Sequence, residues 1–167
     1  MDIKLIILDV DGTLTDGGIY YDSSGQELKK YNVKDGLAIK VAISAGIEFA
    51  ILTGRQSTIV ERRAKELGIK YLLEGVQDKY SSMMKLLQKL NLDLKNVGYI
   101  GDDWNDLQAM KVVAVKGCPS DAAVEVKEIC DIIAEHQGGQ GAVRDCIQKI
   151  LELTSSWTES ATKTYFV

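Results

Sequence analysis

Acidic residues occur in two dense segments of this 167-residue chain, each directly after an apolar run. The first segment covers residues 9–13 and the second covers residues 101–106; their acidic members are Asp9, Asp11, Asp102, Asp103 and Asp106. Such carboxylates repel one another in a low-dielectric cleft unless a cation lies among them. Mg²⁺ suits an all-oxygen ligand set, in which it takes one or two carboxylates and keeps several waters. The two segments therefore predict a magnesium site.

Two further polar residues have the chemistry to complete such a site. Thr53, followed by Gly54, comes directly after the apolar run 48–52, and Lys79 lies at the start of a predicted helix. A hydroxyl group, an ammonium group and a cation together can hold the non-bridging oxygens of a phosphoryl group. Alone, Thr53 would be an ordinary turn residue and Lys79 an ordinary surface lysine. In combination with the carboxylates they predict a phosphate site beside the metal.

The elements that must position these residues alternate between strand and helix. Short apolar runs predict strands over residues 3–8, 48–52, 71–73, 97–100, 112–115 and 131–134. Apolar spacing and end signals predict helices over residues 35–44, 57–67, 78–90 and 142–153, the first capped by Asp35. A β-hairpin is expected over about residues 17–32.

This alternation predicts an α/β fold: a Rossmann-like, open, mostly parallel sheet with helices on both faces. Ligands of such sheets bind at the carboxyl ends of the strands, where the polar segments above would meet. Residues 1–153 are expected to form one domain, followed by a loose tail over residues 154–167.

Composition excludes several classes of protein. With 46% hydrophobic and 26% charged residues the chain is globular, and its net charge of −4 gives no electrostatic reason to bind nucleic acid or anionic lipid. The apolar runs are far shorter than the roughly 18 residues that a membrane span needs. The first ten residues lack the features of a secretory leader, so a cytoplasmic location is expected. The three cysteines have no metal-binding spacing and are expected to be buried thiols.

The four polar motifs, in this order, resemble those of the haloacid dehalogenase superfamily of aspartate-nucleophile phosphatases. The resemblance implies that Asp9 attacks phosphorus to give an aspartyl-phosphate, and that Asp11 acts as general acid and base. It further implies that Mg²⁺ is held by the Asp9 carboxylate, the Asp11 backbone carbonyl and Asp102. The remaining roles it implies are phosphoryl binding by Thr53 and Lys79, and orientation of waters and of Lys79 by Asp103 and Asp106.

The gaps between these motifs leave no room for the large cap domain that many members of the superfamily carry. A capless chain with the segments 16–21, 32–36, 53–57 and 138–144 resembles the 3-deoxy-D-manno-octulosonate 8-phosphate phosphatases. This resemblance implies a sugar acid phosphate as substrate and a homotetramer whose hairpins meet centrally. It also implies that residues 138–144 approach a neighbour's site, although Gln140 stands where the family often has arginine. Candidate substrate contacts are Gly54, Arg55 and Arg63.

Two alternatives stay open at the level of the sequence. A phosphatase for nine-carbon sugar acid 9-phosphates would share all of this chemistry, although Arg55, where those relatives tend to have an acidic residue, favours the eight-carbon acid. A non-catalytic tetramerisation domain is the alternative from another class, and the intact motif residues argue against it. Trp104 is expected to be a packing or pocket-wall residue and His136 a loop residue; neither has a role in the mechanism.

Overall fold

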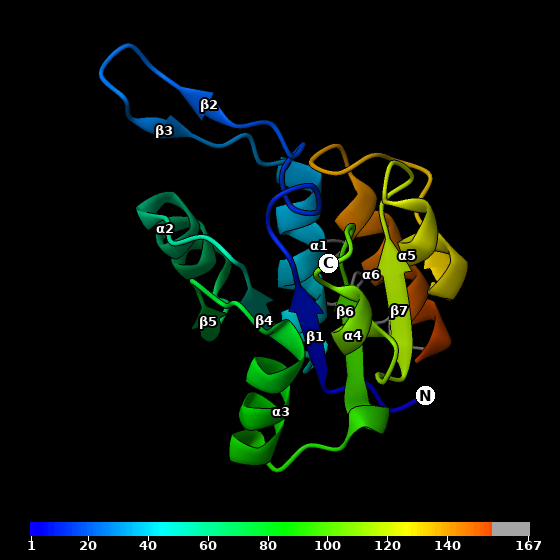
Figure 1. Ribbon diagram of the computed structural model, residues 1–167. Coiled ribbons are helices and arrows are strands. Elements are labelled where there is room, and N and C mark those ends of the chain that lie inside the picture. The colour runs from blue at the N-terminus through cyan, green and yellow to red at the C-terminus, as the bar shows by residue number, and fades with distance from the viewer. Residues whose placement is uncertain (155–167) are drawn as a thin grey trace.

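A six-stranded parallel sheet forms the centre of the fold in the computed structural model, which describes residues 1–154 (Figure 1). Its strands are β1 (Leu5–Leu8), β4 (Glu48–Leu52), β5 (Tyr71–Leu73), β6 (Val97–Ile100), β7 (Val115–Cys118) and β8 (Ile132–Ile133). The strand order is β5-β4-β1-β6-β7-β8, and every neighbouring pair is parallel. The predicted α/β class and the parallel sheet are confirmed.

The strand β1 lies between two halves of the sheet, because β4 and β5 follow on one side of it and β6, β7 and β8 on the other. All four of its residues are buried, as expected of an apolar run covered on both faces. Leu8 is in register with Ile51 of β4 on one side and with Ile100 of β6 on the other. The loops that follow these three strands therefore begin side by side. This is the switch point at which open parallel sheets bind ligands.

Helices cover both faces of the sheet and form two apolar cores. One core contains apolar residues of α1 (Val33–Ser44), α2 (Thr58–Leu67) and α6 (Ala142–Leu153). The other contains apolar residues of α3 (Lys79–Leu90), α4 (Leu107–Met110) and α5 (Val124–Ile129). A short 3₁₀ helix, Leu94–Asn96, precedes β6. None of the helices in residues 1–154 has the length and apolar character needed to cross a bilayer.

A two-stranded antiparallel hairpin, β2 (Tyr20–Tyr21) and β3 (Glu27–Leu28), extends from the end of the sheet at which β1 finishes (Figure 1). Its turn is closed by Asp22, whose carboxylate accepts hydrogen bonds from the backbone N–H groups of Ser24 and Gln26. A single bridge between Thr15 and Tyr31 closes its base. The predicted hairpin is confirmed, with strands of two residues each.

Some predicted boundaries are wrong for identifiable reasons. The strand expected at residues 112–115 is β7, which begins only at Val115 and runs to Cys118, because residues 112–114 belong to the turn after α4, where the N–H of Val113 donates to the carbonyl of Met110. The first helix begins at Val33, with Asn32 as its N-cap. Asp35 does not cap this helix, because its carboxylate accepts a hydrogen bond from the backbone N–H of Arg144 in α6.

Other expectations concern single residues and the end of the chain. Of the two expectations for Trp104, packing in the core is wrong, since the residue is 67% exposed and its indole N–H donates a hydrogen bond to Glu125. Two of the three cysteines, Cys118 and Cys146, are buried, and Cys130 is half-buried. The expected loose tail, apart from Thr154, lies outside the described residues.

Candidate active site

Asp9 occupies the carboxyl end of β1 and is almost completely buried, with 5% of its surface exposed. Its backbone N–H donates to the carbonyl of Ile100, which continues the β1–β6 ladder into the loop. The chain then turns sharply, because the N–H groups of Thr13 and Thr15 both donate to the carbonyl of Val10. This turn fixes the Asp9 carboxylate at the switch point of the sheet.

Three carboxylates converge there: Asp9, Asp102 and Asp106 each offer an oxygen, and these oxygens lie within 4.8 Å of one another. Burial, with the charge of Asp106 added, raises the pKa of Asp9 to about 8. Burial likewise raises the pKa of Asp102 to about 7. The protein's own groups therefore do not compensate these negative charges fully. A divalent cation among the oxygens would do so, and an all-oxygen donor set fits Mg²⁺.

The Asp102 carboxylate is held in place from the opposite loop. Its Oδ1 accepts a hydrogen bond of 2.9 Å from the hydroxyl of Thr13. Gly12 adopts a φ of +91°, and a Cβ at this position would lie 2.1 Å from Oδ2 of Asp102. Only glycine therefore allows the loop after β1 to approach this carboxylate so closely.

Lys79 brings a positive charge into the same cluster from the first residue of α3. Its Nζ lies 2.8 Å from Oδ1 of Asp9 and 2.7 Å from Oδ1 of Asp106, and its side chain is 2% exposed. Burial alone would lower the pKa of Lys79, but the charges of Asp106 and Asp9 outweigh it and raise the pKa above the ordinary value. Lys79 is therefore a permanently charged group beside Asp9.

The Asp106 carboxylate is occupied by donors from the protein itself. Besides Lys79, its Oδ1 accepts a hydrogen bond of 2.7 Å from the hydroxyl of Tyr99. Its Oδ2 accepts from the backbone N–H groups of Asp102 at 3.2 Å and Asp103 at 3.4 Å. With its oxygens used in this way, Asp106 anchors Lys79 and the loop after β6, and it leaves Asp9 and Asp102 as the carboxylates available to a metal. The sequence analysis did not identify Tyr99, because within the apolar run 97–100 it cannot be distinguished from an ordinary core aromatic residue.

Asp11 lies outside the group of three carboxylates, and its side chain is 30% exposed. Its Oδ1 is bound by the ammonium group of Lys29, which belongs to the hairpin. This contact was not predicted, because no sequence pattern distinguishes Lys29 from its neighbour Lys30. The carboxylate of Asp11 is thus held away from the cluster, as a general acid free of the metal would have to be.

The other predicted residues are spread around this centre. Thr53 is buried at the end of β4, and its hydroxyl accepts a hydrogen bond of 3.4 Å from the N–H of Arg55. Gly54 follows it in the loop and is exposed. Arg55 contacts the hairpin through Glu27. Asp103 is exposed, and its carboxylate accepts a hydrogen bond from the backbone N–H of Trp104.

Arg63 lies on α2, with its guanidinium 5.5 Å from the ring centroid of Tyr31. Its Nε is buried without a hydrogen-bond partner, and its terminal nitrogen pairs only with Glu66 among residues 1–154. No hydrogen bond or ion pair within this part of the chain joins Arg63 to the carboxylate cluster.

The glycine-rich segment 138–144 lies against the loop that follows β1 in the same chain. The N–H of Gly139 donates to the carbonyl of Thr13, and a Cβ at Gly138 would lie 1.9 Å from the carbonyl oxygen of Gly12. Glycine at position 138 thus permits backbone to touch backbone behind Asp11.

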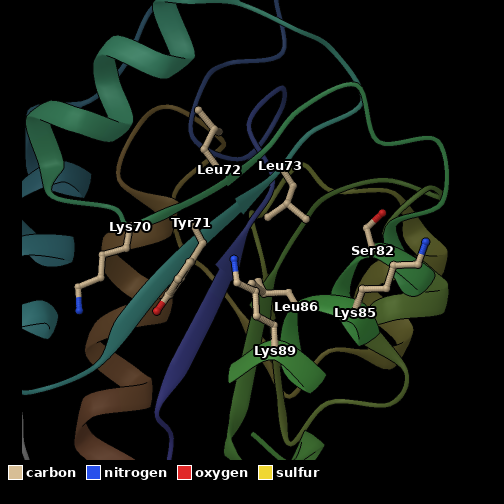
Figure 2. A pocket seen from close by; sticks show the side chains of 8 residues that line it. All are labelled: Lys70, Tyr71, Leu72, Leu73, Ser82, Lys85, Leu86 and Lys89. Atoms are coloured by element: carbon tan, nitrogen blue, oxygen red, sulfur yellow. The ribbon is translucent and has the colours of Figure 1, made fainter. Parts of the chain in front are cut away.

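A pocket of about 420 Å³ lies elsewhere, between β5 and α3 (Figure 2). Figure 2 shows apolar side chains such as Leu73 and Leu86 beside the lysines Lys85 and Lys89. None of the carboxylates, nor Lys79, lines it. The chemistry described above therefore belongs to the open end of the sheet and not to this pocket.

Comparison with known proteins places this geometry in a family. The family model for haloacid dehalogenase-like hydrolases matches residues 6–77 and 72–147. The 3-deoxy-D-manno-octulosonate 8-phosphate phosphatase KdsC of Escherichia coli K12 is 41% identical over 150 residues, which are 90% of this chain and 80% of that protein.

Solved structures agree. The structure of 3-deoxy-D-manno-octulosonate 8-phosphate phosphatase from Moraxella catarrhalis, with magnesium, phosphate and KDO, superposes with a TM-score of 0.93 at 38% identity, covering 96% of this chain and 92% of that one. A probable YrbI family phosphatase from Pseudomonas syringae gives 0.94 at 42% identity, with coverage of 99% and 93%. The conjunction of motifs, fold and buried carboxylates shows that this chain belongs to the haloacid dehalogenase-like hydrolases, as a capless member.

Proposed function

We propose that the protein is a Mg²⁺-dependent phosphomonoesterase that works through an aspartyl-phosphate on Asp9. The observation that carries this proposal is the position of the Asp9 carboxylate, which is buried 2.8 Å from Lys79 and within the group of carboxylates suited to a cation. With Lys79 on one side and a bound divalent cation on the other, the Asp9 carboxylate could approach a phosphate dianion without prohibitive repulsion.

The ion would be held by the carboxylates of Asp9 and Asp102 and by the backbone carbonyl of Asp11. When bound, it supplies charge neutralisation for the cluster and for the phosphoryl oxygens. Lys79 and the hydroxyl of Thr53 would hold phosphoryl oxygens on the protein side. Lys79 is fixed before substrate arrives, because Asp106 anchors it at 2.7 Å.

The reaction then has two transfers. In the first, an oxygen of Asp9 forms a bond to phosphorus while the phosphorus–ester oxygen bond breaks, and the ester oxygen keeps the electron pair and takes a proton from Asp11. In the second, water attacks the phosphorus and gives a proton to Asp11; the Asp9–phosphorus bond breaks and inorganic phosphate leaves. Asp9 and Asp11 return to their initial states.

The proposed substrate is 3-deoxy-D-manno-octulosonate 8-phosphate. Support comes from the names of the relatives, from the KDO bound in the Moraxella catarrhalis structure, and from the absence of a cap domain in residues 1–154. Arg55 and Arg63 are the candidate contacts for the sugar acid's carboxylate, and Gly54 offers its backbone next to Arg55.

Steady-state kinetics of the purified protein with Mg²⁺ test this proposal. We expect the highest kcat/KM for the eight-carbon acid 8-phosphate, a lower value for nine-carbon acid 9-phosphates, and measurable hydrolysis of p-nitrophenyl phosphate. A higher kcat/KM for a nine-carbon substrate would reassign the specificity. Hydrolysis of none of the three would leave the chain as a non-catalytic domain.

We also propose a cytoplasmic homotetramer assembled through the hairpin. Ile19, Tyr21 and Leu28 of the hairpin region are each more than half exposed in the single chain. Two strands alone are marginally stable in water, so burial of these side chains against other copies would stabilise the hairpin. Light scattering at working concentration tests the assembly, and a monomeric mass would contradict it.

A further inference from the structure

We propose that Lys29, on the hairpin, is a positioning residue for Asp11, so that the hairpin forms part of the catalytic machinery. This inference rests on the proposed function, in which Asp11 protonates the leaving group. It concerns a residue for which neither the motifs nor the resemblance to known phosphatases gave a role.

The burial of Lys29 is unusual for its surroundings. Tyr21 and Leu28 on the same hairpin are 61% and 55% exposed, and the side chain of the adjacent Lys30 is 63% exposed. The side chain of Lys29 is only 4% exposed. An ammonium group is costly to bury unless it is paired, so a specific set of partners must hold it.

Those partners are two carboxylates. The Nζ of Lys29 binds Oδ1 of Asp11, and it lies 3.3 Å from Oε1 of Glu27 on β3. Glu27 fixes the lysine from its own strand, and Asp11 receives the lysine from the loop after β1. The buried charge of Lys29 is therefore directed at the proposed acid and base.

Glu27 extends these contacts to the loop after β4. Its Oε1 lies 3.0 Å from a terminal nitrogen of Arg55, and its Oε2 accepts a hydrogen bond of 2.7 Å from the hydroxyl of Ser57. The hairpin is thus joined to two catalytic loops at once, through Lys29 on one side and Glu27 on the other. These contacts restrict the positions that the side chain of Asp11 can adopt.

The chemical consequence follows from the way a carboxyl group transfers a proton. Lys29 binds Oδ1 of Asp11, and in the proposed mechanism the other oxygen of Asp11 would exchange the proton with the leaving oxygen of the substrate. Without Lys29, the side chain of Asp11 could rotate toward solvent or toward the metal, and both positions remove it from the leaving oxygen. The loss should appear where protonation of the leaving group limits the reaction.

Two substrates with different leaving groups separate this role from a structural one. Nitrophenolate is a weak base and departs with little need of a proton, whereas the alkoxide of a sugar 8-phosphate requires one. The value of kcat/KM reports the steps up to departure of the leaving group, so hydrolysis of the aspartyl-phosphate does not affect the comparison.

For Lys29→Met we expect kcat/KM for 3-deoxy-D-manno-octulosonate 8-phosphate to fall about 10- to 100-fold, and that for p-nitrophenyl phosphate to fall less than about threefold. Lys29→Arg, which keeps the charge, should restore part of the loss. Lys30→Met is the matched control and should leave both values unchanged. Thermal unfolding of each variant shows whether the fold is retained.

Equal losses with the two substrates, or no loss with either, would overturn the inference and leave the proposed function intact. If the wild-type protein with Mg²⁺ hydrolysed neither substrate, the proposed function would fail and this inference with it. The two failures are therefore distinguishable by the behaviour of the wild-type protein.

Discussion

The ammonium group of Lys79 lies 2.7 Å from Oδ1 of Asp106, and both side chains are excluded from solvent. The pair links the start of α3 to the loop after β6, two elements that the sequence separates by 27 positions. Because the same ammonium group lies 2.8 Å from Asp9, Asp106 determines where the positive charge sits relative to the proposed nucleophile. We therefore expect both the stability of the fold and the turnover to depend on this contact.

Replacement of Asp106 by Asn should reduce both stability and turnover. The substitution removes the charge that faces Lys79 and leaves the ammonium with Asp9 alone, so the free energy of unfolding should fall by about 3 kcal/mol. Urea unfolding and phosphatase assays measure the two effects. Glu152→Gln, at the exposed ion pair with Lys149, is the control and should cost less than about 1 kcal/mol. Equal effects of the two substitutions would contradict the anchoring role.

Asp9→Asn should abolish turnover and preserve the fold. The amide is nearly the same size as the carboxylate but is a poor nucleophile toward phosphorus, and burial already disfavours a charge at this position. Activity with p-nitrophenyl phosphate and the thermal midpoint are the two measurements. Asp2→Asn serves as the control, because Asp2 is exposed and lies before the first residue of β1, at the end of the strand away from Asp9. Full activity of purified Asp9→Asn would remove Asp9 as the nucleophile.

The meeting of these residues was predictable because strand ends in a parallel sheet have a fixed geometry. The buried run of β1 and the polar residues after β1, β4 and β6 were sufficient to place Asp9, Thr53 and Asp102 at one edge. The same reasoning placed β4, β5, β6 and α6 at their observed bounds, because each combines a clear apolar period with a clear end signal.

Contacts that depend on tertiary approach were not predictable. Asp35 precedes Arg144 by 109 positions, and nothing in its local sequence indicates that it binds the first turn of α6 instead of capping its own helix. The hydroxyl of Tyr99 can donate a hydrogen bond to Asp106 only because the loop between them turns tightly. Helices α4 and α5 were missed because four and six residues are too few to display a helical period.

Mg²⁺ should stabilise the protein more at high pH than at low pH. The pKa values of Asp9 and Asp102 are raised to about 8 and about 7, so without metal their contribution to stability is present below about pH 4 and is lost as the pH rises toward 8. The metal binds the deprotonated forms and offsets this loss. Thermal unfolding with Mg²⁺ or with a chelator, at pH 6 and pH 8.5, measures the increment.

The chelator should also abolish turnover, and added Mg²⁺ should restore it. Asp102→Asn is the variant that should diminish the stabilising increment, because it removes one of the two available carboxylates. An increment independent of pH, or activity that persists without a divalent ion, would contradict the proposed metal site.

Asp35 should also make the free energy of unfolding depend on pH. Burial raises its pKa to about 6 from 3.8, so the folded protein binds this proton more tightly than the unfolded chain does. Its contribution is therefore fully present below about pH 4 and is lost as the pH rises through 6, by about 3 kcal/mol at most. Urea unfolding of wild type and Asp35→Asn between pH 4 and pH 8 isolates it. The free energy of unfolding of the variant should rise relative to that of wild type between pH 4 and pH 8, because only wild type loses the contribution of Asp35. A difference that stays constant with pH would contradict the assignment.

Gly12→Ala tests whether the approach of the catalytic loop to Asp102 is required. The added Cβ would lie 2.1 Å from Oδ2 of Asp102, and the alanine would have to adopt a φ of +91°. The loop or the carboxylate must therefore move. Gly25→Ala is the matched control, because Gly25 has a φ of +81° with no atom within 4 Å of the added Cβ. Both variants should lose about 1 kcal/mol from backbone strain. Only Gly12→Ala should weaken the thermal stabilisation by Mg²⁺ and lower kcat, because only there does the new methyl group displace a carboxylate that the metal needs. Equal Mg²⁺ responses in the two variants would show that the carboxylate accommodates the methyl group.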